Sequence, residues 1–173
     1  MKNIVLSTAL LVIDVQQGLF NRSTPIYKAD LLLQNIHLLV ERAHQAGVPV
    51  IYVQHQSDKV FPVGSVNWQL HPSLHPRENE LIIHKQHGSA FEDTTLGEEL
   101  DKLGIARLVI CGLVTHGCIR AGTQDALKRG YQVTLASDAH SNYSKDAAKL
   151  IETWNTQLAQ AGAEVIKTEA IVF

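Results

Sequence analysis

The sequence is poor in the residues that mark several common classes of protein. Its 173 residues include two cysteines, one methionine and five prolines, and aromatic residues make up 6% of the chain. Two cysteines do not form a disulfide framework, so we expect a protein of the reducing cytoplasm. No apolar run approaches the roughly 20 residues of a membrane span. Repeats, linkers and low-complexity segments are also missing, which predicts a single domain over residues 1–173.

The chain also lacks an excess of charge of either sign. It has 15 Lys and Arg residues against 17 Asp and Glu, a formal net charge of −2. Proteins that bind nucleic acid or anionic membranes are usually strongly basic, so we expect a small-molecule ligand and neither of those partners. Histidine is plentiful, with nine residues, so metal binding has to be considered.

The chain does contain an alternation of apolar runs and amphipathic segments. Apolar runs typical of buried strands occupy residues 8–13, 50–53, 81–84, 108–110, 131–137 and 164–166. Helical periodicity or helix-end signals predict helices over 30–46, 95–103, 118–129 and 146–161, the second of them opened by a capping box at Thr95 and Glu98. Loops are predicted over 15–20 and, at greater length, over 59–80. This alternation predicts an α/β fold, with helices on both faces of a parallel sheet. We therefore expect a three-layer, doubly wound sandwich with a six-stranded parallel sheet.

Polar residues follow most of the predicted strands. Asp14, Gln54 to Asp58, Lys85, Cys118 and Asp138 to His140 each come after a different strand. The carboxyl ends of parallel strands share one edge of the sheet, where open α/β folds bind their ligands. Taken singly, Asp14 could cap a turn and Lys85 could be a solvated surface charge. Their common position favours one shared site.

Cys118 lies in a polar turn at the expected start of a helix. Unpaired N–H groups and the helix dipole at such a position stabilise a thiolate. Spacing excludes a phosphate-binding loop, a cysteine-dependent phosphatase, and a redox or zinc pair with Cys111. Cys118 is then either a nucleophile or an inert buried thiol, and Cys111, inside the apolar run, is a core residue. His116 and His140 offer an alternative Cys–His dyad.

Several motifs resemble those of the isochorismatase-like cysteine hydrolases, which include nicotinamidases, N-carbamoylsarcosine amidases and ureidoacrylate amidohydrolases. The resemblance runs almost from end to end, through Ala9-Leu-Leu-Val-Ile-Asp-Val-Gln16, Lys85, Ser89-Ala-Phe91, Cys111-Gly-Leu-Val-Thr-His-Gly-Cys118 and Ser137-Asp-Ala139. It implies a Rossmann-type, isochorismatase-like hydrolase domain and a catalytic triad of Asp14, Lys85 and Cys118. It also implies a cis peptide between Leu113 and Val114, with the backbone N–H groups of Val114 and Cys118 as the oxyanion hole.

The resemblance implies a cysteine hydrolase that cleaves a C–N bond of a small amide, imide or carbamoyl compound through a thioester. Nicotinamidases carry an Asp-x-His pattern in a metal site near the second strand. The segment Gln54-His-Gln56 lacks that pattern, so we expect neither a metal nor another cofactor. True isochorismatases act on a vinyl ether and lack the cysteine, so Cys118 favours C–N hydrolysis.

Four residues are candidates for substrate binding: Phe20, His55, Trp68 and His71. Each could instead only pack against its neighbours. The resemblance also implies a homo-oligomer, either a dimer or a tetramer. Two alternative functions remain: a non-catalytic binding or interaction module on the same fold, and an ether hydrolase of the isochorismatase type.

Overall fold

A six-stranded sheet forms the centre of the computed structural model, which describes residues 7–173. Its strands are β1 (Thr8–Ile13), β2 (Val50–His55), β3 (Leu81–Lys85), β4 (Arg107–Leu113), β5 (Gln132–Ser141) and β6 (Glu164–Ile166). They lie in the order β3-β2-β1-β4-β5-β6, and every neighbouring pair is parallel. The chain therefore reverses its direction of travel across the sheet between β1 and β4. Sheets of this kind bind ligands at the carboxyl ends of the strands beside such a reversal.

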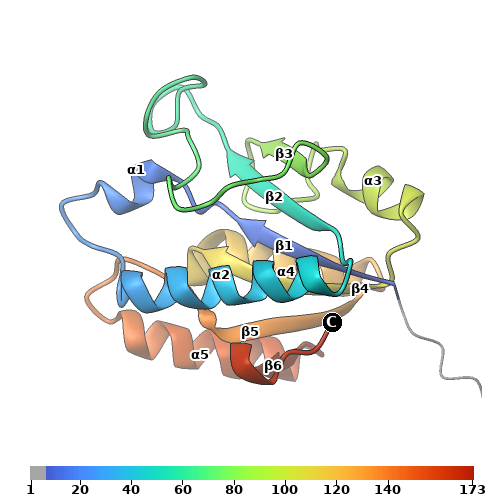
Figure 1. Cartoon of the computed structure of the whole chain (residues 1–173). Helices are drawn as coiled ribbons and strands as arrows, with labels where there is room; N and C mark the ends of the chain where they lie inside the picture. The colour runs from blue at the N-terminus through green and yellow to red at the C-terminus, as the bar shows by residue number, and fades with distance from the viewer. Residues whose placement is uncertain (1–6) are drawn as a thin grey trace, which may run out of the picture.

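Helices cover both faces of the sheet (Figure 1). One face packs on α2 (Ala29–Gln45), with the short helix α1 (Gln17–Phe20) beside it. The opposite face packs on α3 (Leu96–Lys102), α4 (Arg120–Lys128) and α5 (Ala147–Gln160). The structure confirms the predicted three-layer, doubly wound α/β fold. Residues 1–6 of the predicted domain lie outside the described residues.

The side chains of β1 alternate between the hydrophobic cores on the two faces of the sheet. Leu10 and Val12 belong to the core under α2, whereas Leu11 and Ile13 belong to the core under the other helices. Successive side chains of a strand point to opposite faces, so a strand buried on both sides reads as a continuous apolar run. Within residues 7–173, no helix has the length and apolar character needed to cross a membrane.

A glycine lets β4 approach the end of β1. Gly112 pairs with Ile13 and has a φ of +122°. A Cβ atom at Gly112 would lie 2.1 Å from the carbonyl oxygen of Ile13. No other residue fits there without moving one strand. This contact holds the residue before Asp14 against the strand that leads to Cys118.

Three local predictions need correction. Residues 17–20, predicted as a loop, form α1. The Thr95 side chain makes no capping hydrogen bond to α3, and the Leu96 N–H donates to Thr94 Oγ1 instead, at 3.3 Å. Strand β5 does not end at Ser137 but continues to Ser141 through a register shift against β4. The bulge lets pairing resume, so Asp138 to His140 lie inside the strand.

The long loop predicted over residues 59–80 is confirmed. It joins β2 to β3 and extends beyond the sheet in Figure 1. An antiparallel bridge between Gln16 and Leu70 ties it to the segment after β1. The loop is therefore anchored at the carboxyl edge of the sheet, where the predicted site residues lie.

Candidate active site

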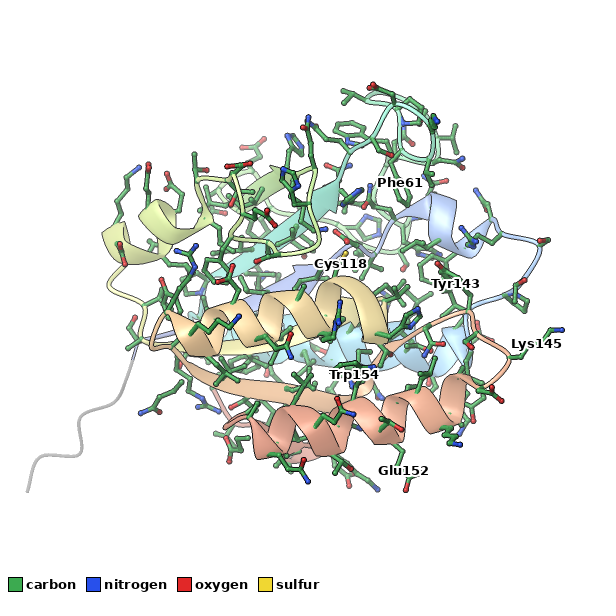
Figure 2. All side chains as sticks on the ribbon, turned by 180° about the vertical axis from the view of Figure 1, so that it is seen from behind. Phe61, Cys118, Tyr143, Lys145, Glu152 and Trp154 are labelled. Atoms are coloured by element: carbon green, nitrogen blue, oxygen red, sulfur yellow. The ribbon has the colours of Figure 1, made fainter. Side chains whose placement is uncertain are left out.

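Three of the predicted site residues arrive from three different strands. Asp14 follows β1, Lys85 is the last residue of β3, and Cys118 lies in η1 (Thr115–Ile119), a π-helical turn that joins β4 to α4. Figure 2 shows Cys118 beside the carboxyl ends of the strands, below the loop that carries Phe61. The convergence predicted from the strand ends is present for these three residues.

The ammonium group of Lys85 lies at the centre of the site. Its Nζ is 2.9 Å from Asp14 Oδ2 and 3.1 Å from Cys118 Sγ. It also donates to the carbonyl oxygen of His87 at 3.0 Å. Burial opposes the charged form of Lys85, but Asp14 and Cys118 outweigh it and raise the lysine pKa above its ordinary value. Lys85 is therefore a buried cation, paired with a buried carboxylate.

One carboxylate oxygen of Asp14 has no hydrogen-bond partner among the described residues. Its backbone takes a positive φ of 51°, and its N–H donates to the Val53 carbonyl oxygen at 2.9 Å. Whereas Oδ2 pairs with Lys85, Oδ1 is buried and has no hydrogen-bond partner among residues 7–173. The carboxylate and the Cys118 sulfur lie within 4.8 Å of each other. A free acceptor beside a thiol can take up its proton.

Cys118 is a thiol at rest. Burial and the neighbouring Asp14 carboxylate raise its pKa to about 12, although Lys85 acts in the opposite direction. Burial and Asp14 therefore act against the stabilisation of the thiolate that is expected from the helix dipole. Cys118 remains partly exposed, whereas Cys111 is fully buried and contacts the Leu11 carbonyl oxygen. The prediction that Cys111 is a core residue is confirmed.

His55 is a fourth member of the cluster. It pairs in register with Lys85 across β2 and β3, and its Nδ1 is 2.9 Å from Lys85 Nζ. The ring packs edge-on against Phe61, with 5.7 Å between centroids. Burial and the Lys85 charge lower the pKa of His55 below its ordinary value. His55 is therefore neutral beside the ion pair.

Gln16 supports this cluster and was not a predicted site residue. Its buried amide donates to the carbonyl oxygens of His55 and Trp68, both at 2.8 Å. Its Oε1 accepts the His55 N–H at 2.8 Å. Gln16 thereby joins β2 and the long loop to the end of β1. Its position two residues after Asp14 was a signal that could have marked it.

The other substrate-binding candidates lie in or beside the long loop. Phe20 and His71 are in ring contact, with centroids 4.5 Å apart, and the His71 N–H donates to the Val15 carbonyl oxygen at 2.8 Å. Trp68 lies 5.4 Å from the His84 ring, and its Nε1 is buried without a hydrogen-bond partner among the described residues. That these side chains contact substrate stays a prediction.

Other residues predicted at this edge serve elsewhere. Asp138 accepts hydrogen bonds from the backbone and hydroxyl of Thr168, at 2.8 and 2.7 Å. His140 is buried, with its ring nitrogens bonded to Thr115 at 3.0 Å and Asn155 at 2.9 Å. The prediction that Asp138 to His140 join the site is wrong because β5 continues past them. Among residues 7–173, neither His140 nor His116 is hydrogen-bonded to Cys118, which disfavours the Cys–His dyad.

The turn before Cys118 has the backbone feature that the family resemblance implies. The peptide bond between Leu113 and Val114 is cis. The turn then bends at Gly117, whose φ of −109° and ψ of −107° are not helical. The assignment of the Val114 and Cys118 N–H groups as the oxyanion hole stays a prediction.

Asp14, His55 and Cys118 also form a group that could supply three metal ligands, with donor atoms within 4.8 Å of one another. Lys85 Nζ lies within 3.1 Å of an atom of each of these residues. A buried ammonium at that position repels a divalent cation. The residues do not fit a metal ion while Lys85 is charged.

Comparison with known proteins identifies the family of this chain. The family model for the isochorismatase domain matches residues 8–170. A streptothricin hydrolase from Streptomyces noursei is 34% identical over 142 residues, covering 81% of this chain and 56% of the relative. A second S. noursei streptothricin hydrolase is covered over 51% of its length, so the chain spans about half of each.

Two further relatives match over most of their length. A probable inactive nicotinamidase from Arabidopsis thaliana is 33% identical over 156 residues, covering 77% of this chain and 80% of that protein. The crystal structure of an isochorismatase from Pseudomonas putida KT2440 superposes with a TM-score of 0.88 at 28% identity, covering 96% of this chain and 90% of the other. This chain therefore belongs to the isochorismatase family.

Proposed function

We propose that this protein hydrolyses a C–N bond of a small amide, imide or carbamoyl compound through a thioester on Cys118. One observation carries the proposal: the buried Lys85 ammonium is within hydrogen-bond distance of both the Asp14 carboxylate and the Cys118 sulfur. A nucleophile, a base and a group that orients both are the parts that covalent catalysis requires.

Acylation begins with a protonated Cys118. Asp14 takes the thiol proton through its free Oδ1 as the sulfur attacks the carbonyl carbon, and Lys85 stabilises the developing thiolate charge. The Val114 and Cys118 N–H groups hold the oxyanion, a contribution of about 3–4 kcal/mol per donor. The proton on Asp14 then passes to the leaving nitrogen. The C–N bond breaks, and the acyl group stays on the sulfur as a thioester.

Deacylation uses the same groups in reverse. Asp14 takes a proton from a water molecule, which attacks the thioester carbon. The C–S bond breaks, the acid product leaves, and the proton on Asp14 returns to the sulfur. Cys118 ends as a thiol, which is its resting form.

The proposal extends to the surroundings of the triad. Phe20, His55, Trp68 and His71 would shape the substrate pocket, and residues 1–173 would work as one hydrolase domain without a cofactor. A cytoplasmic dimer or tetramer remains the predicted form of the protein.

The test is a screen of primary amides, carbamoyl compounds and cyclic imides, including nicotinamide and streptothricin, with mass spectrometry of the products. We expect an amine or ammonia to be released by the wild type and by Cys111→Ala, and no turnover by Cys118→Ala. Acyl-enzyme trapped by acid quenching should carry its added mass on Cys118. Turnover by Cys118→Ala would remove the basis of the thioester mechanism.

The description of one relative as a probable inactive nicotinamidase favours a second candidate, a binding module without turnover. That function predicts ligands that bind stoichiometrically and are recovered unchanged. An ether hydrolase predicts products from vinyl ethers and none from the amides of the screen.

A further inference from the structure

The Lys85 ammonium has more hydrogen-bond acceptors than hydrogens. An ammonium group carries three N–H donors. Four acceptors surround Nζ: Asp14 Oδ2 at 2.9 Å, the His87 carbonyl oxygen at 3.0 Å, Cys118 Sγ at 3.1 Å and His55 Nδ1 at 2.9 Å. Three hydrogens cannot each point at one of four acceptors, so at least two of the acceptors compete for one hydrogen.

His55 is fixed as one of the four. Gln16 binds both its backbone N–H and its carbonyl oxygen, and Phe61 packs on its ring. Lys85 can only donate, so Nδ1 must accept, and in a neutral imidazole the proton is then on Nε2. Burial and the charged or titratable groups Lys85 and His87 disfavour protonation of His55. Asp14 acts in the opposite direction, and the net pKa of His55 is lowered.

Asp14 and the His87 carbonyl oxygen are the acceptors that we expect to hold two of the three Lys85 hydrogens. The carboxylate is charged, and charge-assisted bonds are the stronger class, whereas His87 lies two residues from Lys85 on the same segment. The third hydrogen is left between His55 Nδ1 and the Cys118 sulfur. A thiol sulfur is a weak acceptor and a thiolate is a strong one, so the protonation state of Cys118 decides where that hydrogen points.

We propose that His55 is a positioning residue that sets the basicity of Cys118 by competing with its sulfur for one hydrogen of Lys85. The inference rests on the proposed role of Cys118 as the nucleophile. At rest the third hydrogen points to His55, and it turns to the sulfur when Asp14 removes the thiol proton. No proton leaves Lys85 in this exchange. Because His55 competes with the thiolate, it keeps the thiolate basic and therefore nucleophilic.

The test compares His55→Leu with His55→Asn in a Cys111→Ala background, so that Cys118 is the single thiol. Leucine has no acceptor, whereas the asparagine oxygen can lie near the position of Nδ1. The readout is the rate of alkylation by a neutral reagent as a function of pH, which needs no substrate. Thermal unfolding of both variants reports whether each is folded.

In His55→Leu the third hydrogen belongs to the sulfur alone, and we expect a thiol pKa lower by about one unit, a tenfold larger thiolate fraction. The less basic thiolate is also a weaker nucleophile, with a Brønsted coefficient of about 0.4–0.5, so alkylation at a fixed pH below the midpoint should be about threefold faster. His55→Asn should stay close to the wild-type profile.

An unchanged profile in a folded His55→Leu protein would overturn the inference. So would an equal acceleration in both variants, because it would assign the effect to loss of the imidazole and not of the acceptor. Both results leave the amide screen untouched, so this inference and the proposed function fail separately. A role of His55 in substrate binding alone would raise KM and leave the alkylation profile in place.

Discussion

Two cysteines seven residues apart have opposite surroundings. Cys111 is enclosed by the core between β4 and its neighbours, and burial alone raises its pKa. Cys118 also has a raised pKa, but Asp14 is among the causes and Lys85 opposes them. Only the second thiol has groups beside it that can take its proton and stabilise its anion.

Replacing Asp14 with asparagine should change two properties of Cys118 in opposite directions. Loss of the carboxylate removes a negative charge that raises the thiol pKa, while Lys85 stays. Alkylation of Cys118 by a neutral reagent should therefore be faster than in the wild type at neutral pH. Hydrolysis should fall by about 10²–10⁴-fold, because neither the attacking water nor the leaving nitrogen has a proton partner.

Both rates can be measured on one preparation, with Cys111→Ala as the control for alkylation at the wrong thiol. A general loss of structure would also expose Cys118 and speed its alkylation, so thermal unfolding of Asp14→Asn must first show a folded protein. Slower alkylation in a folded Asp14→Asn protein would contradict the assigned influence of the carboxylate on the thiol.

Placement at strand ends made Asp14, Lys85 and Cys118 predictable. Each follows an apolar run, and parallel pairing brings the ends of such runs to one edge. The same rule failed for Asp138 to His140, because the bulge that prolongs β5 depends on its pairing with β4. The role of Gln16 was also hidden, since it depends on contacts with residues 39 and 52 positions away.

At the level of the strands, Gly112→Ala should destabilise the protein far more than Gly130→Ala. Both glycines have positive φ angles, +122° and +89°, but a Cβ at Gly130 meets nothing within 4 Å. Gly130→Ala should lower the free energy of unfolding by about 1–2 kcal/mol, the cost of the left-handed conformation. At Gly112 the clash with the Ile13 carbonyl adds about 1–3 kcal/mol or more.

Urea unfolding of the two variants measures the difference, and the soluble yield reports a variant too unstable to purify. Because Ile13 precedes Asp14, any Gly112→Ala protein that folds should also hydrolyse more slowly. Equal stabilities of the two variants would show that β1 and β4 can separate at this point without loss.

At the scale of the whole molecule, the buried groups that titrate at alkaline pH all make the free energy of unfolding fall as the pH rises. The pKa values of Tyr52 and both cysteines are raised, mainly by burial. The pKa of Lys85 is raised as well, because Asp14 and Cys118 outweigh its burial. For a raised folded-state pKa, the stabilisation is complete below the unfolded pKa and is lost as the pH rises toward the folded one.

The free energy of unfolding should therefore fall as the pH rises above about 9, the ordinary pKa of a cysteine thiol. Between pH 9 and 11 the unfolded chain loses thiol protons that the folded chain keeps, so each buried thiol contributes a slope of up to about 1.4 kcal/mol per pH unit. Cys111→Ala removes one such group and should flatten the slope by that amount. Urea unfolding at several pH values under reducing conditions measures it, with pH 7 as the reference for the cavity that the alanine leaves. Parallel curves for wild type and Cys111→Ala would mean that this thiol ionises as readily in the folded protein as in the unfolded one.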